Sequence, residues 1–308
     1  MSDEHGFNNP PGSHATNAAP IVVIGDSFVH GASVKDGDDI AGQMRRLGKA
    51  AVNLGIWGDG SLIELATLTE YGIRLHPRAV FWIYFEGNDL VELAEEKQSS
   101  SLTPYLEEGY SQHLANEQDR VDQLLKQYCD TEERKLSGAS DTHLPVPGSS
   151  TPRGSLVEQV RAWPIVQVVR LRHLRSWVTA WCRQRESAAV GWARDRVKED
   201  DLALFRQVLT VAAQRVKQSG AKFYFVYLPD QTRFSQKLSR SLIWRERGKV
   251  LSIVETLNLP RLDLSEEFAR HPDPLSLYIS RSFYSHFNQA GNELVARACL
   301  ERLKTDGM

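Results

Sequence analysis

The sequence predicts an α/β protein with three layers, in which helices cover both faces of a central parallel sheet. Short apolar runs that are typical of buried strands occur at 21–24, 51–54, 79–85 and 222–228, and stretches with helical periodicity separate them. Strands that alternate with helices in this way form parallel sheets with two buried faces. The 308 residues are enough for one large domain of this kind that carries an insertion.

The first elements follow one another directly. A lead-in over 1–20 is rich in Gly, Pro, Asn and Ser and is expected to be extended or loose. The first strand leads into a helix that starts near Ser27. A second helix is expected over 38–48, with Asp38 or Asp39 as its N-cap.

The next helix is expected over 61–74. Ser61 and Glu64 stand at its start with the spacing of a capping box, in which each side chain bonds the backbone of the other. The α/β pattern resumes later in the chain with further helices and one short strand, expected over 200–218, 238–257, 261–264 and 289–303.

Between these two halves, the pattern of residues 91–197 is charged and helical, which predicts a helical insertion into a domain made of 21–90 and 198–308. A segment rich in Ser, Gly and Pro at 136–155 is expected to be an exposed loop. The stretch 163–181 is amphipathic, with aromatic and basic residues together. It predicts either a helix docked on the core, or a lid or membrane-surface helix that makes peripheral membrane contact.

Composition excludes several classes of function. The net charge of −2 gives no basic surface for nucleic acid, so no nucleic-acid partner is expected. The three cysteines, Cys129, Cys182 and Cys299, are widely spaced without metal-ligand spacing and are expected to be buried thiols. There is no apolar run of 18 residues and no apolar signal segment at the N-terminus, which predicts a cytoplasmic protein.

Glycine and polar residues follow three of the predicted strands. Gly25-Asp26-Ser27 follows the first strand, Gly58 lies a few residues beyond the second, and Gly87-Asn88-Asp89 follows the third. The carboxyl ends of parallel strands meet at one edge of the sheet, where ligands bind in open α/β folds. These three segments are therefore expected to form one site.

The residue types in this site are those that acyl transfer requires. Ser27 is the candidate nucleophile, at a helix start where free N–H groups favour a developing oxyanion. The N–H groups of Ser27 and Gly58 and the amide of Asn88 are the candidate oxyanion-hole donors. His286, in a loop before the last helix, is the candidate general base, and His30 is a second-ranked rival.

These four blocks resemble those of the SGNH/GDSL hydrolase superfamily. Ser27 matches the family nucleophile, Gly58 and Asn88 match its oxyanion-hole donors, and His286 matches its base. The lead-in 3–9 also resembles the segment before the nucleophile in bacterial members that are linked to surface polysaccharides. Because such members often carry an N-terminal membrane anchor, the resemblance implies a membrane-associated or periplasmic protein if the start of the chain is truncated.

One position departs from the family pattern. The family places an aspartate three residues before the histidine, where this chain has Phe283. Asp263, Asp273 and Glu86 are the candidate replacements for this orienting acid, together with a backbone carbonyl. Loss of the acid in a Ser-His-Asp triad lowers turnover by as much as ~10⁴.

The predicted function is therefore a serine esterase that hydrolyses small acyl esters through an acyl-enzyme on Ser27. It needs no metal and no organic cofactor. The resemblance implies an O-acetyl group on a saccharide as the substrate. Three alternatives stay open: an O-acyltransferase that uses the same serine, a catalytically impaired binding protein of this fold, and a membrane-surface protein.

Overall fold

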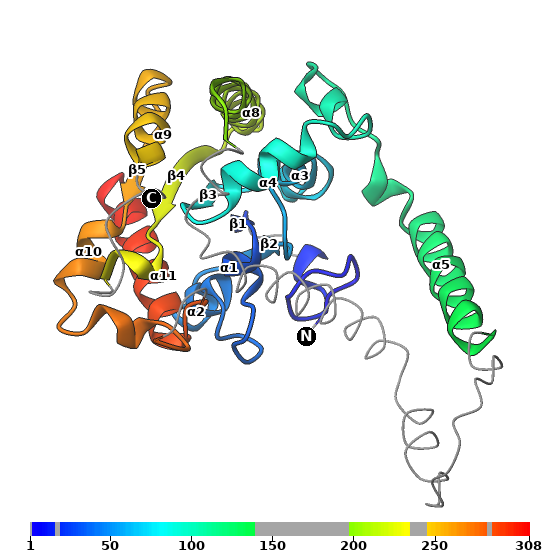
Figure 1. Cartoon of the computed structure of the whole chain (residues 1–308), viewed down its shortest axis with the longest axis horizontal. Helices are drawn as coiled ribbons and strands as arrows, with labels where there is room; N and C mark the ends of the chain where they lie inside the picture. The colour runs from blue at the N-terminus through cyan, green and yellow to red at the C-terminus, as the bar shows by residue number, and fades with distance from the viewer. Residues whose placement is uncertain (1, 16–18, 139–196, 235–244, 282–284) are drawn as a thin grey trace, which may run out of the picture. The chain divides into compact units, whose positions relative to one another are not determined.

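The computed structural model describes residues 2–15, 19–138, 197–234, 245–281 and 285–308 (Figure 1). Residues 1–115 and 190–308 form one compact unit, and 116–189 form a second. The described part of the second unit is the helix α5, Gln118–Gly138. All the strands described below belong to the first unit, and so does the segment from 91 to 115 at the start of the expected insertion.

A parallel sheet of five strands forms the centre of the first unit. Its order is β2-β1-β3-β4-β5, and every neighbouring pair is parallel. This is the order of flavodoxin-like, doubly wound sheets. The strands are β1 Ile21–Gly25, β2 Ala51–Gly55, β3 Ala79–Phe85, β4 Lys222–Leu228 and β5 Arg261–Asp263.

Helices cover both faces of this sheet, as Figure 1 shows. Alternate residues of each strand enter two separate apolar cores, so that Val22 and Ile24 face one core while Ile21 and Val23 face the other. The first core packs against α3 Ser61–Thr67, α4 Asp89–Glu96, α8 Glu199–Gln218 and α9 Arg245–Thr256. The second packs against α1 Ser27–His30, α2 Ile40–Arg46, α10 Ser265–Arg270 and α11 Gln289–Thr305. The predicted three-layer α/β/α fold is confirmed.

The start of α3 differs from its prediction. Gly60 is the N-cap, and Ser61 is already the first helical residue. Among the described residues, the Oγ atom of Ser61 and both carboxylate oxygens of Glu64 have no hydrogen-bond partner. The predicted capping box is therefore wrong. The carboxylate of Glu96 in α4 takes its place, because it accepts from the N–H groups of Gly60 at 2.6 Å and Leu62 at 2.9 Å.

The cap of α2 agrees with its prediction, whereas the helix predicted over 61–74 is α-helical over only part of that range. Asp39 caps α2 by accepting from the N–H of Gly42 at 3.0 Å, as predicted. The helix predicted over 61–74 is α-helical only to Thr67 and continues as a π-helical turn, Leu68–Gly72, and a 3-10 turn, Ile73–Leu75.

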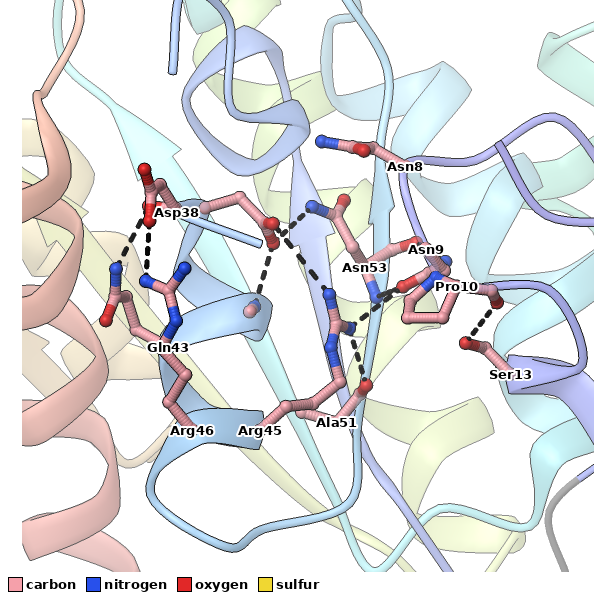
Figure 2. Close-up of polar contacts among 12 residues, drawn as sticks. Asn8, Asn9, Pro10, Ser13, Asp38, Gln43, Arg45, Arg46, Ala51 and Asn53 are labelled. Carbon is pink, nitrogen blue, oxygen red and sulfur yellow. Dashed lines mark hydrogen bonds and ion pairs between the residues drawn. The ribbon is translucent and has the colours of Figure 1, made fainter. Parts of the chain in front are cut away.

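The lead-in is packed against the sheet, so the expectation of a loose segment is wrong for residues 3–9. The side-chain amide of Asn9 donates to the carbonyl of Asn53 and accepts from its N–H, both at 2.8 Å (Figure 2). Asn9 thus pairs with the edge strand β2 as a neighbouring strand would. Asp3 holds the turn by accepting from the N–H of Phe7 at 2.9 Å and the amide of Asn9 at 2.7 Å.

Several predictions lie outside the described residues: the amphipathic stretch 163–181, Cys182 and most of the loop 136–155. Cys299 is a buried thiol as predicted, whereas Cys129 is a free thiol that is half-buried on α5. No helix in the described part of the chain has both the length and the apolar character needed to cross a membrane.

Candidate active site

The site lies where the chain leaves β1 and β3 on opposite faces of the sheet. The strands β1 and β3 are neighbours, but β1 runs into α1 on one face and β3 into α4 on the other. This divergence is the switch point at which doubly wound sheets bind ligands. Asp26 and Asn88, from the two loops, meet there with Nδ2 of Asn88 3.2 Å from Oδ2 of Asp26.

Ser27 is the first residue of α1 and is buried beside the end of β1. Asp26 caps the helix by accepting from the N–H of Phe28 at 2.9 Å. Gly25 before it leaves no room for a side chain, because a Cβ there would lie 2.8 Å from the carbonyl oxygen of Ile83. The tight turn therefore requires glycine, and it presents Ser27 at the edge of the sheet.

The structure brings Ser27 and His286 together, although 259 positions separate them in the sequence. Nε2 of His286 lies 2.8 Å from Oγ of Ser27, which is hydrogen-bond distance. The loop that carries the histidine is held by a β-bridge between Tyr278 and Phe287 and by the bond from the N–H of Ile279 to the carbonyl of His286 at 2.9 Å.

Aromatic rings surround the imidazole of His286. The ring of Phe28 lies 4.9 Å away, centroid to centroid, and that of Trp57 lies 5.9 Å away in an edge-on arrangement. Burial, together with the nearby His30, lowers the pKa of His286 from 6.5 to about 4. The ring is therefore neutral at pH 7, in the state that accepts a proton.

The acids predicted to orient His286 are engaged elsewhere. Asp263 forms an ion pair with Arg247 and accepts from the N–H of Ser265 at 3.0 Å, while Asp273 forms an ion pair with Arg281. Nδ1 of His286 makes no hydrogen bond with any residue that the structure describes. In the described structure, arginines pair with both carboxylates, and neither Asp263 nor Asp273 forms a hydrogen bond with His286.

The third candidate acid, Glu86, is also engaged elsewhere. Its carboxylate accepts from the hydroxyl of Tyr227 at 2.5 Å and the N–H of Asp230 at 2.6 Å, and it pairs with Arg233. The rival base His30 points Nδ1 to the carbonyl of Gly55 at 3.4 Å. Neither residue forms a hydrogen bond with Ser27 in the described structure.

The two predicted oxyanion-hole residues differ in how they are placed. Gly58 has φ of +81°, which requires glycine, and no atom lies within 4 Å of the position that a Cβ would take. Asn88 lies at the start of α4, where its Nδ2 donates to Asp26 at 3.2 Å and to Glu92 at 2.9 Å. Both amide hydrogens of Asn88 are therefore directed to carboxylates.

A group of carboxylates lies beside the serine, and the sequence analysis did not single it out. We call it the carboxylate cluster and define it as Asp26, Asp59, Glu64, Asp89, Glu92 and Glu96. Burial raises the pKa of all six groups, and repulsion from neighbouring carboxylates raises it further for Asp59, Glu64, Asp89 and Glu92. The pKa rises to about 8 for Asp59 and to about 7 for Glu96. The sequence signal was the spacing of Asp89, Glu92 and Glu96, which puts three acids on one face of α4.

A cavity of ≈ 330 Å³ lies away from Ser27, between the lead-in and α2. Figure 2 shows its polar lining. Arg45 is bound there to the side chain of Asn9 and the carbonyl of Ala51, and Arg46 pairs with Asp38. The two guanidinium groups are thus already bound to protein oxygens.

Comparison with known proteins gives similarity of structure only. No protein-family model matches the sequence, and no curated protein matches it. A lipase/acylhydrolase from Enterococcus faecalis is 12% identical with a TM-score of 0.45, over 94% of this chain and 97% of that chain. A GDSL-like lipase from Bacteroides thetaiotaomicron is 10% identical with a TM-score of 0.44, over 95% and 94%. An alpha/beta hydrolase from the metagenome of Lake Arreo is 12% identical with a TM-score of 0.44, over 94% and 97%. Sequence identities and TM-scores this low do not assign a function to the chain.

Proposed function

We propose that this protein is a serine esterase of the SGNH type, with Ser27 as nucleophile and His286 as general base. The observation that carries the proposal is the distance of 2.8 Å between Nε2 of His286 and Oγ of Ser27. A serine hydroxyl is a weak nucleophile unless an adjacent base removes its proton. The neutral imidazole, with its lowered pKa, is in the state that can do so.

The reaction proceeds in two halves. Oγ of Ser27 attacks the ester carbonyl carbon while its proton passes to Nε2 of His286. The imidazolium then gives this proton to the leaving alkoxide oxygen, and the acyl group stays on Ser27. In the second half, His286 takes a proton from water as the water oxygen attacks the acyl carbon, and the proton returns to Oγ as the acid leaves.

The oxyanion of each tetrahedral intermediate requires hydrogen-bond donors beside Ser27. The N–H groups of Ser27 and Gly58 and the amide of Asn88 are the proposed donors. Because both hydrogens of Asn88 are directed to carboxylates, the oxyanion has to replace one of them. The bond to Asp26 is the longer of the two, at 3.2 Å, and is the one we expect to be exchanged.

The proposed substrate is a small acyl ester, with an O-acetylated saccharide as the specific class. Trp57 supports the saccharide because this residue is 49% exposed and its ring lies 5.9 Å from that of His286, centroid to centroid. A large amphipathic ring at this place offers a surface for the alcohol half of the ester. A Trp57→Ala variant is expected to raise KM for an acetylated sugar while leaving KM for p-nitrophenyl acetate within about twofold, since the loss of one contact surface acts on the larger substrate.

The proposal is tested by hydrolysis of p-nitrophenyl acetate with wild type, Ser27→Ala and His286→Ala. Both variants are expected to lose at least about 10³-fold in kcat, because the two residues act as one unit. The matched control is His271→Ala, which removes a side chain whose bonds among the described residues are to Asp273 in its own turn. Full turnover by Ser27→Ala would refute the proposal.

A second reading, the binding protein of this fold, is favoured because no carboxylate of the described residues bonds Nδ1 of His286. It predicts a folded wild type with no turnover above that of Ser27→Ala. An O-acyltransferase would hydrolyse the same ester but would give an acetylated sugar as product when a sugar acceptor is added.

A further inference from the structure

The carboxylate cluster beside Ser27 is buried without a counter-charge. None of its six members forms an ion pair with a lysine, arginine or histidine among the described residues. Two other buried carboxylates of the same unit do have such partners, Asp201 in Lys97 and Glu86 in Arg233. Burying several unpaired carboxylates is costly, so a compensating positive charge is expected at this place.

Three members of the cluster are close enough to share one ion. One carboxylate oxygen from each of Asp26, Asp89 and Glu92 lies within 4.8 Å of those of the other two. Asp26 directly follows β1, and Asp89 and Glu92 lie in the first turn of α4, so the sheet and the helix fix their spacing. Oδ1 of Asp89 and Oε2 of Glu92 are buried and have no hydrogen-bond partner among the described residues.

Further oxygen atoms without partners occur at the facing helix. Both carboxylate oxygens of Glu64 in α3 are buried and unpartnered in the described structure, and this side chain is within electrostatic range of Asp89 and Asp26. Ser61, one turn earlier, is fully buried, and its Oγ is unpartnered as well. Ser61 stands between Gly60 and Leu62, whose N–H groups bond Glu96 of the cluster.

We propose that the carboxylate cluster binds one calcium ion beside Ser27, with Asp26, Asp89 and Glu92 as its ligands and Glu64 and Ser61 as further oxygen donors. A set made only of carboxylate and hydroxyl oxygens selects hard divalent cations. Calcium takes six to eight oxygen ligands in flexible geometry, whereas magnesium usually keeps several waters and is bound through one or two carboxylates. Three carboxylates that lie within 4.8 Å of one another therefore favour calcium.

The ion would also alter the electrostatics of the serine. Asp26 is adjacent to Ser27, and its carboxylate is 3.4 Å from Oγ. Negative charge at this distance opposes an oxyanion, and a bound cation offsets that charge. The binding of the ion does not depend on the proposed esterase activity, so the two can fail separately.

The test is calcium binding to the full-length protein after treatment with EDTA. Isothermal titration with CaCl2 at constant ionic strength is expected to show one ion per chain, with a rise in the melting temperature. MgCl2 is expected to bind at least about tenfold more weakly. No heat and no change in melting temperature with wild type would overturn the proposal, and tighter binding of Mg²⁺ would overturn the choice of calcium.

Variants on α4 locate the ion. Glu92→Gln keeps the acceptor for Asn88 but removes one ligand charge, and it is expected to weaken calcium binding at least about tenfold. Glu95→Gln changes the same residue type at an exposed position on the same helix and is expected to bind as wild type does. Circular dichroism checks that both variants are folded. Undiminished binding by a folded Glu92→Gln would show that the ion sits elsewhere and would overturn the site.

Discussion

At the residue scale, the imidazole of His286 is held between Phe28 and Trp57, with Nε2 directed at Ser27. Packing and the short loop before α11 fix the ring, since no described carboxylate reaches Nδ1. The same burial disfavours the imidazolium, which the reaction has to form. The pKa of His286 and the reactivity of Ser27 are therefore linked.

This link predicts the pH dependence of the reaction. The pKa of His286 is lowered to about 4, so the neutral base persists well below its usual range. The acid limb of kcat/KM for p-nitrophenyl acetate is therefore expected near pH 4. A limb near pH 6.5 would show a ring in contact with water and would contradict the described burial.

The same shift affects stability. The unfolded chain takes up a proton at this histidine near pH 6.5 and the folded chain only near pH 4. The stabilisation from the neutral ring is therefore present above pH 6.5 and is lost as the pH falls from 6.5 towards 4. In urea unfolding, His286→Ala is expected to reduce the dependence of stability on pH in this window, and an unchanged dependence would count against the assignment.

Asn88 gives a second prediction at this scale. If its amide binds the oxyanion, Asn88→Ala lowers kcat by about 10²–10³-fold with little change in KM, because the bond strengthens only as the oxyanion forms. Stopped assays over a range of substrate concentrations separate the two constants. A loss confined to KM would instead make Asn88 a residue that binds the ground state.

At the element scale, the polar side chain of Asn9 takes the place of a strand beside β2. Both of its bonds to the backbone of Asn53 are buried. Asn9→Ala removes them and leaves an N–H and a carbonyl unsatisfied, so it is expected to lower the free energy of unfolding by about 1–3 kcal/mol. Asn8→Ala is the control, since Asn8 makes one partly buried bond to the carbonyl of His30. Equal effects of the two variants in urea unfolding would contradict the pairing with β2.

The elements show what the sequence could predict. The apolar runs of β1, β3 and β4 are continuous because both faces are buried, and this made their bounds readable within one residue. The start of α3 was misjudged because its N-terminal N–H groups bond Glu96, which is distant in sequence, and the local pattern of Ser61 and Glu64 could not reveal this partner.

In the site too, residues that follow strands could be predicted, whereas partners that are distant in sequence could not. Ser27 and Asn88 were predicted to lie together because both follow parallel strands, and the structure places their loops within hydrogen-bond distance. The surroundings of the candidate acids could not be predicted, since nothing in the sequence indicated that Asp263 and Asp273 are paired with arginines. The carboxylate cluster joins residues from three separate segments, and only its part on α4 has a sequence pattern.

At the scale of the whole molecule, the buried carboxylate cluster lowers the stability of the first unit at high pH. The pKa of Asp59 is raised to about 8 by burial first and by Glu96 and Asp26 next. Between its unfolded pKa near 4 and its folded pKa near 8, the folded chain holds a proton that the unfolded chain has released. Stability therefore falls as the pH rises through this window.

This predicts a measurable slope in protein freed of metal by EDTA. The urea midpoint of wild type is expected to fall between pH 6.5 and 8.5, above the range in which His286 acts. Asp59→Asn removes one titrating group and is expected to flatten the slope and to raise the midpoint at pH 8.5. A midpoint of wild type that is constant over this range would mean that the cluster is ionised or solvated in the folded state.

The central claim is that His286 activates Ser27 as a nucleophile. Its most direct test is labelling of the intact protein with a serine-reactive phosphonate, followed by peptide mass spectrometry of wild type and His286→Ala. The account predicts a single adduct on Ser27 in wild type and a strongly reduced adduct in His286→Ala. A folded wild type without an adduct on Ser27, or with equal labelling in the two proteins, would contradict it.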